Sequence, residues 1–185
     1  MNSFWYLFDQ GLPDIACDSI LDCWSDVESN RAKVGDTKQI EMSAIRNSKV
    51  IKCPFGSDLQ TRFSELLNHF LVVANRDCFG FDLNDFNEYQ IAQYEKGDYY
   101  IEHLDLGLER EFERKLSITV QLSDPTEYKG GDLVFGSGIP NPPSDKLKNR
   151  GAILIFPSFV PHQVKPVTEG QRMSLVGWYE GKKWC

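Results

Sequence analysis

Two segments in the first half of the chain carry apolar side chains at the spacing of an amphipathic helix. The first begins at Pro13 and runs to Trp24, and the second begins at Asp58 and runs to Val73. Both have an acidic residue at the start, where a helix favours a capping side chain and negative charge. We therefore predict that residues 1–85 form a mainly helical lead.

From about residue 88 the pattern changes to short runs rich in β-branched and aromatic residues, separated by glycine, proline and aspartate. The predicted strands are 89–94, 99–104, 116–122, 132–135, 152–156 and 173–179. Gly130 and Gly131 predict a tight connection, because glycine adopts positive φ at little cost. A longer irregular loop follows at 136–150, and the sequence leaves open whether it closes over a substrate.

Many short strands after a helical lead predict an α+β, mainly β fold: a jelly-roll or double-stranded β-helix core, cupin-like, supported by N-terminal helices. The sequence shows no internal repeat and no second domain. We therefore expect a single domain over residues 1–185, with the jelly-roll core in 86–185.

Composition narrows the class of protein. The 185 residues are 41% hydrophobic and 25% charged, which is ordinary for a globular domain with its own core. The net charge of −7 disfavours nucleic acid or an anionic membrane as the main partner. No apolar run is long enough to span a bilayer and no secretory leader is evident, so we expect a cytoplasmic protein. The five cysteines are scattered, which suggests neither a disulfide framework nor a zinc knuckle.

One predicted strand carries two candidate metal ligands. His103 and Asp105 are two residues apart, so their side chains would leave the same face of a strand. His162 is a third candidate. Two imidazoles and one carboxylate form the facial triad that binds non-haem Fe(II) and leaves coordination positions open. The remaining histidine, His69, lies near the polar edge of the second helix, where a surface role is favoured.

A cation downstream of these ligands suggests an adjacent anion site. Arg172 follows His162 by ten residues, and a guanidinium can hold a carboxylate through two parallel hydrogen bonds. If 2-oxoglutarate chelates the metal, Arg172 is suited to bind its far carboxylate. Ser174 shares the face of Arg172 on a strand, which makes its hydroxyl a candidate second donor.

Two adjacent tyrosines precede the metal ligands. Tyr99 and Tyr100 leave opposite faces of the predicted strand, so at most one of them reaches the metal site. Strand parity puts Tyr99 on the face of His103, and a β-bulge would reverse that assignment. The sequence does not decide between the two.

The second half of the chain resembles, in the order and spacing of its segments, the Fe(II)/2-oxoglutarate dioxygenases of the prolyl 4-hydroxylase type. The nearest likeness is to bacterial and viral prolyl and lysyl hydroxylases. The pattern Tyr-x-x-Gly-x-x-Tyr-x-x-His-x-Asp is matched from Tyr94 to Asp105. Further matching segments lie at 114–133, 157–162, 166–172 and 178–179. The first 85 residues have a looser likeness.

The resemblance implies a role for each candidate. The three candidate ligands would hold iron, and Arg172 would anchor the distal carboxylate of 2-oxoglutarate. Tyr94 would donate a phenolic hydrogen bond to that carboxylate, and Trp178 would line the active site. Related halogenases lack the carboxylate ligand, so Asp105 favours hydroxylation. One departure is Gln121, which stands where many relatives have an aromatic residue.

The implied reaction consumes O₂, decarboxylates 2-oxoglutarate to succinate and carbon dioxide, and hydroxylates a substrate C–H bond. No catalytic residue beyond the metal ligands is implied, and ascorbate is a candidate reductant. We expect a peptidyl proline, in a peptide or protein partner, as the substrate. Two alternatives stay open. One is hydroxylation of a lysyl residue or a small amino acid, and the other is a non-catalytic jelly-roll sensor that binds metal and 2-oxoglutarate.

Overall fold

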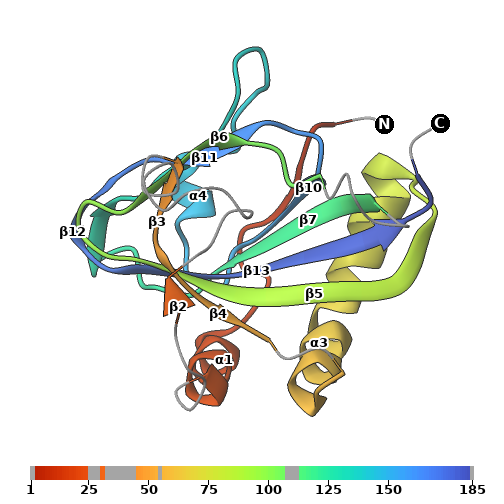
Figure 1. Ribbon diagram of the computed structural model, residues 1–185, viewed down its shortest axis with the longest axis horizontal. Helices are drawn as coiled ribbons and strands as arrows, with labels where there is room; N and C mark the ends of the chain where they lie inside the picture. Colours follow the sequence, from red (N-terminus) through yellow and green to blue (C-terminus); the bar gives the residue numbers. More distant parts are fainter. Residues whose placement is uncertain (1–2, 25–29, 32–44, 54–55, 107–112, 184–185) are drawn as a thin grey trace.

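The fold is a sandwich of two antiparallel sheets, shown in Figure 1 as a computed structural model that describes residues 3–24, 30–31, 45–53, 56–106 and 113–183. The large sheet contains, in spatial order, β1 (Tyr6–Phe8), β10 (Ile153–Pro157), β7 (Glu113–Gln121), β13 (Arg172–Gly181), β5 (Leu83–Tyr94), β4 (Lys49–Lys52) and β2 (Asn30–Arg31). The small sheet contains β3 (Arg46–Asn47), β6 (Tyr99–His103), β11 (His162–Val164) and β9 (Leu133–Phe135). A separate pair joins β12 (Val167–Gly170) to β8 (Tyr128–Gly130). The predicted jelly-roll core is confirmed.

Two long helices lie against the large sheet, as predicted (Figure 1). They are α1 (Asp14–Trp24) and α3 (Asp58–Ala74), and α3 continues into a π-helical turn, η1 (Asn75–Phe79). Ser57 caps α3 by accepting a hydrogen bond from the backbone N–H of Gln60. Gly80 ends this helical segment in the left-handed conformation, at φ 70°, which costs glycine little.

Alternation along β7 gives the large sheet two different faces. One set of side chains belongs to the main hydrophobic core with residues of both long helices: Leu116, Ile118 and Val120. The alternate set is polar, is also buried, and faces the interior between the two sheets: Ser117, Thr119 and Gln121. Buried polar groups need hydrogen-bonding partners, so this interior is suited to a polar ligand.

The first half of the chain is less purely helical than the sequence predicts. Strands β1, β2, β3 and β4 all lie in it, and they extend the two sheets of the core. Three short strands of the second half, β8, β11 and β12, are also absent from the sequence-based prediction. Strands of two to four residues carry too little alternation to be recognised locally, because pairing with distant segments determines them.

The loop segments agree in part with the sequence. Gly130 and Gly131 adopt positive φ of 74° and 61°, which confirms the predicted tight connection. The segment 136–150 contains a short helix, α4 (Ser144–Leu147), that the sequence does not predict. In the described part of the chain no helix is long and apolar enough to cross a membrane, and the four described cysteines are free thiols.

Replacing Leu67 with alanine is expected to lower the free energy of unfolding by about 2–5 kcal/mol, because this side chain is fully buried between α3 and the large sheet. Urea denaturation of the purified protein measures the change. Val72→Ala on the same helix is the matched control, since Val72 is 53% exposed and its loss should change the free energy by less than about 0.5 kcal/mol. Equal losses would contradict this packing of α3.

Candidate metal centre

Two histidines from distant parts of the chain lie opposite each other on neighbouring strands. In the antiparallel pair β6–β11, His103 faces His162, and the two ring centroids are 4.2 Å apart. Asp105 follows β6, and its backbone N–H donates to the carbonyl of Ser158 at 2.9 Å. That bond holds Asp105 against the turn that leads into β11. The structure therefore brings all three predicted ligands together.

The three ligating atoms face one another. The Nε2 atom of His103 lies 3.6 Å from Oδ1 of Asp105, and Nε2 of His162 lies 3.5 Å from Oδ2. All three ligand atoms lie within 4.8 Å of one another. Two imidazole nitrogens and one carboxylate oxygen at this spacing can share one metal ion, and this donor set fits Fe(II).

Backbone carbonyls fix the orientation of both imidazoles. Nδ1 of His103 lies 2.9 Å from the carbonyl oxygen of Ile101, and Nδ1 of His162 lies 2.9 Å from that of Val160. A carbonyl oxygen can only accept, so Nδ1 carries the proton in each ring and Nε2 keeps its lone pair for a metal. Such partners commonly orient the histidines of metal sites.

Ser117, on strand β7 of the large sheet, supports the carboxylate of Asp105. Its hydroxyl donates to Oδ2 of Asp105 at 2.7 Å and lies 3.0 Å from the hydroxyl of Ser158. Ser117 and Ser158 are not among the site residues predicted from the sequence. For Ser117 the available indication was the strict alternation of polar and apolar residues over 115–122.

The electrostatics of the site favour metal binding. Burial alone would raise the pKa of Asp105, but His162, His103 and the Ser117 hydroxyl together hold that pKa well below its ordinary value. Burial lowers the pKa of His162 and outweighs the attraction of Asp105. At neutral pH Asp105 is therefore ionised and His162 neutral, which are the forms that bind a metal ion.

A β-bulge decides which tyrosine accompanies the metal ligands. Opposite the two-residue step from His162 to Val164 on β11, β6 has a three-residue step between His103 and Tyr100. The extra residue reverses strand parity, and the ring of Tyr100 stacks on His103 with centroids 3.5 Å apart. The guanidinium of Arg46, on β3, lies 4.6 Å from the centroid of the Tyr100 ring.

The predicted anion site lies on the same polar interior face. Arg172 on β13 pairs across the sheet with Tyr94 on β5, and its guanidinium carbon lies 5.7 Å from the centroid of the Tyr94 ring. Ser174 is the next residue of β13 on that face, opposite Gln121. All four side chains are buried. Within the described ranges no carboxylate lies within ion-pair distance of Arg172, so this buried cation lacks the partner that such a charge requires.

Trp178 lies on the interior face near the metal ligands, opposite Ser117. The guanidinium of Arg114 stacks on its indole ring at 3.9 Å and pairs with Glu88 at 2.6 Å. The indole N–H of Trp178 and the Nε–H of Arg114 are both buried and have no hydrogen-bond acceptor among the described residues. Arg114 is not among the site residues predicted from the sequence, because the charges alternate from Glu109 to Arg114 and this pattern is typical of a solvated connection.

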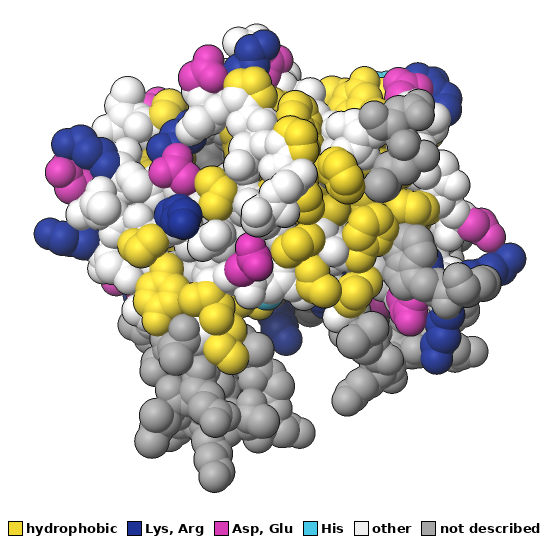
Figure 2. Space-filling model, turned by 90° about the horizontal axis from the view of Figure 1, so that it is seen from above, with side chains coloured by type: hydrophobic (Ala, Val, Ile, Leu, Met, Phe, Trp, Pro, Cys, Tyr) yellow, Lys and Arg dark blue, Asp and Glu magenta, His cyan; other side chains and the backbone are white. Residues whose placement is uncertain are grey.

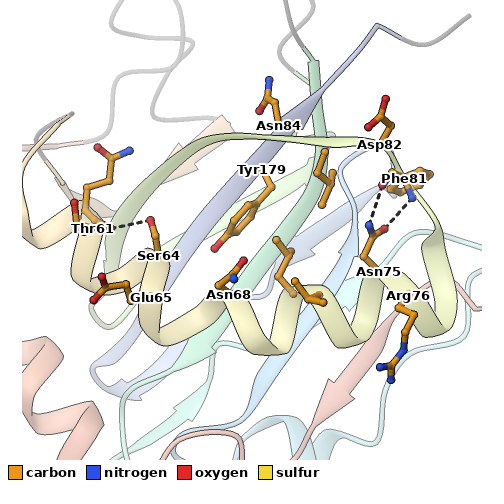
Figure 3. A pocket seen from close by; sticks show the side chains of 14 residues that line it. Thr61, Ser64, Glu65, Asn68, Asn75, Arg76, Phe81, Asp82, Asn84 and Tyr179 are labelled. Atoms are coloured by element: carbon orange, nitrogen blue, oxygen red, sulfur yellow. Dashed lines mark hydrogen bonds between the residues drawn. The ribbon is translucent and has the colours of Figure 1, made fainter.

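Two other features lie outside this centre. His69 is exposed on α3, with its ring 5.7 Å from that of Phe70, and takes no part in the ligand cluster. A separate hollow of about 760 Å³ lies between α3 and strands β5 and β13, where Tyr179 points toward the helix (Figure 3). None of the metal or anion-site residues lines this hollow.

Sequence comparison identifies relatives of the second half of the chain. Residues 89–180, about half of the chain, match the 2OG-Fe(II) oxygenase superfamily. A PKHD-type hydroxylase of Idiomarina loihiensis is 36% identical over 90 residues, which cover 49% of this chain and 40% of that protein. A PKHD-type hydroxylase of Prochlorococcus marinus is 41% identical over 85 residues, which cover 46% of this chain and 38% of that protein. The chain spans about two fifths of the length of these curated relatives.

Solved structures share the fold over nearly the whole chain. A prolyl-4-hydroxylase of Pseudomonas putida superposes with a TM-score of 0.72 at 21% identity, covering 98% of this chain and 94% of that chain. A prolyl hydroxylase from Trichoplax adhaerens, in complex with a hypoxia inducible factor peptide fragment, gives a TM-score of 0.71 at 16% identity, covering 96% of this chain and 83% of that chain. At these identities the likeness shows the fold alone.

The sequence match and the geometry coincide. The three clustered ligands, the anion site and Trp178 all lie between residues 89 and 180. The chain belongs to the 2OG-Fe(II) oxygenase superfamily.

Proposed function

We propose that this protein is an Fe(II)- and 2-oxoglutarate-dependent hydroxylase in which His103, Asp105 and His162 hold the iron. One observation carries the proposal: the buried guanidinium of Arg172, which lacks a carboxylate partner among the described residues, shares a polar interior with the ligand cluster. Membership of the oxygenase superfamily supports the same cofactors. Arg172 would bind the distal carboxylate of 2-oxoglutarate, with Tyr94 and Ser174 as further hydrogen-bond donors.

The residues of the chain would act by positioning. Iron, 2-oxoglutarate and O₂, when bound, supply the chemistry that hydroxylates a C–H bond and yields succinate and carbon dioxide. The carbonyls of Ile101 and Val160 hold the histidine rings, and Ser117 holds the carboxylate of Asp105. The buried interior excludes water from the reacting groups, while Trp178 would line the substrate side.

We propose a peptidyl proline as the substrate. Relatives named PKHD-type hydroxylases and a solved prolyl hydroxylase with a bound peptide support this assignment. The surface next to the metal ligands also suits a peptide, since Ile101 and Leu104 are 42% and 47% exposed. Figure 2, seen from above relative to Figure 1, shows a band of hydrophobic side chains on this side of the molecule.

A peptide panel tests the substrate assignment. Proline-containing peptides, matched lysine-containing peptides and free amino acids are incubated with Fe(II), 2-oxoglutarate and O₂. Succinate release coupled to the mass gain of one oxygen on a prolyl residue is the expected result. Oxidation confined to lysyl residues or free amino acids would favour the first alternative. Binding of Fe(II) and 2-oxoglutarate without succinate release would favour the sensor.

Three further expectations from the sequence stay predictions. They are ascorbate as the reductant, a cytoplasmic location and a single domain over residues 1–185.

His103→Ala should abolish both metal binding and 2-oxoglutarate turnover, because two remaining ligands hold Fe(II) poorly. Metal content is measured by titration with Mn(II), and turnover by succinate release. His69→Ala is the matched control, since His69 is exposed and lies outside the cluster. It should keep wild-type metal content and rate. A His103→Ala protein that retains both properties would refute the metal assignment.

Ser117→Ala should weaken Mn(II) binding by about 10- to 100-fold, because it removes the hydroxyl that supports the carboxylate of Asp105. The affinity is measured by calorimetry without 2-oxoglutarate. Ser174→Ala is the matched control: Ser174 is also buried, lies on the same sheet face opposite Gln121, and is outside the ligand cluster. It should bind Mn(II) like the wild type. Equal affinity of both variants would show that Ser117 does not support the ligand.

A further inference from the structure

Gln121, on β7, donates hydrogen bonds to two neighbours in the polar interior, Tyr128 and Ser123. Its Nε2 atom donates to the hydroxyl of Tyr128 at 3.1 Å and to the carbonyl of Ser123 at 3.3 Å. The carbonyl fixes the amide orientation, because a carbonyl oxygen can only accept. The hydroxyl oxygen of Tyr128 is therefore the acceptor in its bond with Gln121.

The hydroxyl of Tyr128 consequently has a proton left to donate. Its second polar neighbour is Arg172, which also can only donate. Among the described residues no acceptor is assigned to this O–H, and the Tyr128 side chain is 5% exposed. Burial raises the pKa of Tyr128 against the opposing charges of Arg172 and Lys148, so the phenol keeps its proton at neutral pH. A buried O–H donor thus lies beside a buried guanidinium that lacks an anion.

Little open space is left beside these residues. A Cβ atom at Gly131 would lie 2.9 Å from Cδ of Arg172, so glycine gives the arginine room. Behind Arg172 the remaining cavity measures about 20 Å³, which is space for about one water molecule. Lys148 lines this cavity, but its charge is paired with Asp132 at 2.7 Å. Arg172 is therefore the cation that a bound carboxylate would meet.

We propose that Tyr128 donates its hydroxyl hydrogen bond to the distal carboxylate of 2-oxoglutarate beside Arg172, and that Gln121 is the positioning residue that holds the phenol in place. This inference rests on the proposed function. In this chain a further hydroxyl beside Arg172 thus comes from β8 and is held by Gln121 on β7. The small space left beside Arg172 limits the length of the dicarboxylate.

The test measures ligand binding to the Mn(II)-loaded protein by calorimetry, without turnover. Tyr128→Phe removes the O–H and keeps the ring. It should weaken 2-oxoglutarate binding by about 10- to 100-fold, since hydrogen bonds to charged groups are among the stronger ones. Binding of pyruvate, a 2-oxo acid without a distal carboxylate, should be unchanged. Mn(II) affinity should also stay at the wild-type value.

Gln121→Leu provides the second arm. It should weaken 2-oxoglutarate binding less than Tyr128→Phe, and its effect should disappear when the two changes are combined, because Gln121 acts through the phenol. Tyr6→Phe on β1 is the control for a tyrosine hydroxyl outside the site, and it should bind 2-oxoglutarate like the wild type. 2-Oxoadipate, longer by one methylene, should bind the wild type more weakly than 2-oxoglutarate.

The outcomes separate this inference from the function on which it rests. If the wild type binds 2-oxoglutarate and Tyr128→Phe binds it equally well, the role of Tyr128 is refuted while the proposed function stands. A similar loss for pyruvate and 2-oxoglutarate would show a general disturbance and would also refute the role. Failure of the wild type to bind 2-oxoglutarate at all would overturn the proposed function itself.

Discussion

The pairing of β6 with β11 is the interaction on which the candidate site depends. It places His103 opposite His162 although 58 residues lie between them in the sequence. Strand β6 and the turn before β11 supply the carbonyls of Ile101 and Val160 that orient the two rings, and the same turn holds Asp105 through Ser158. A shift of one residue in this register would turn one imidazole away from the other. The geometry of the candidate metal site therefore depends on strand register.

The large sheet packs in the hydrophobic core with one face and lines a polar interior with the other. Burial of polar side chains without partners costs free energy, and Arg172, Gln121 and Ser174 are all buried. The opposite face of the same strands packs against α1 and α3 in the main hydrophobic core. Each strand thus contributes to the core with one set of side chains and to the site with the other. This division explains why a chain of ordinary hydrophobic content can keep a charged interior.

The sequence predicts the parts of this structure that local patterns encode. The helices α1 and α3 follow from apolar periodicity, and the ligand cluster with Arg172 follows from residue types and spacing. The bulge that brings Tyr100 onto His103 could not be predicted, because it arises from the pairing of β6 with a segment far along the chain. The bond between Ser117 and Asp105 and the contact between Gln121 and Tyr128 depend in the same way on tertiary register. The alternation of side chains along a single strand does not predict such contacts.

The stack of Arg46 on Tyr100 and of Tyr100 on His103 has a consequence for the smallest piece of this protein that could work. The stretch shared with the superfamily begins at residue 89, whereas Arg46 belongs to β3, far ahead of it. An excised fragment covering only 89–180 would lose the outer layer of this stack and leave the edges of β5 and β6 without their partners β4 and β3. The segment ahead of residue 89 therefore contributes, through Arg46, to the packing around the candidate metal centre.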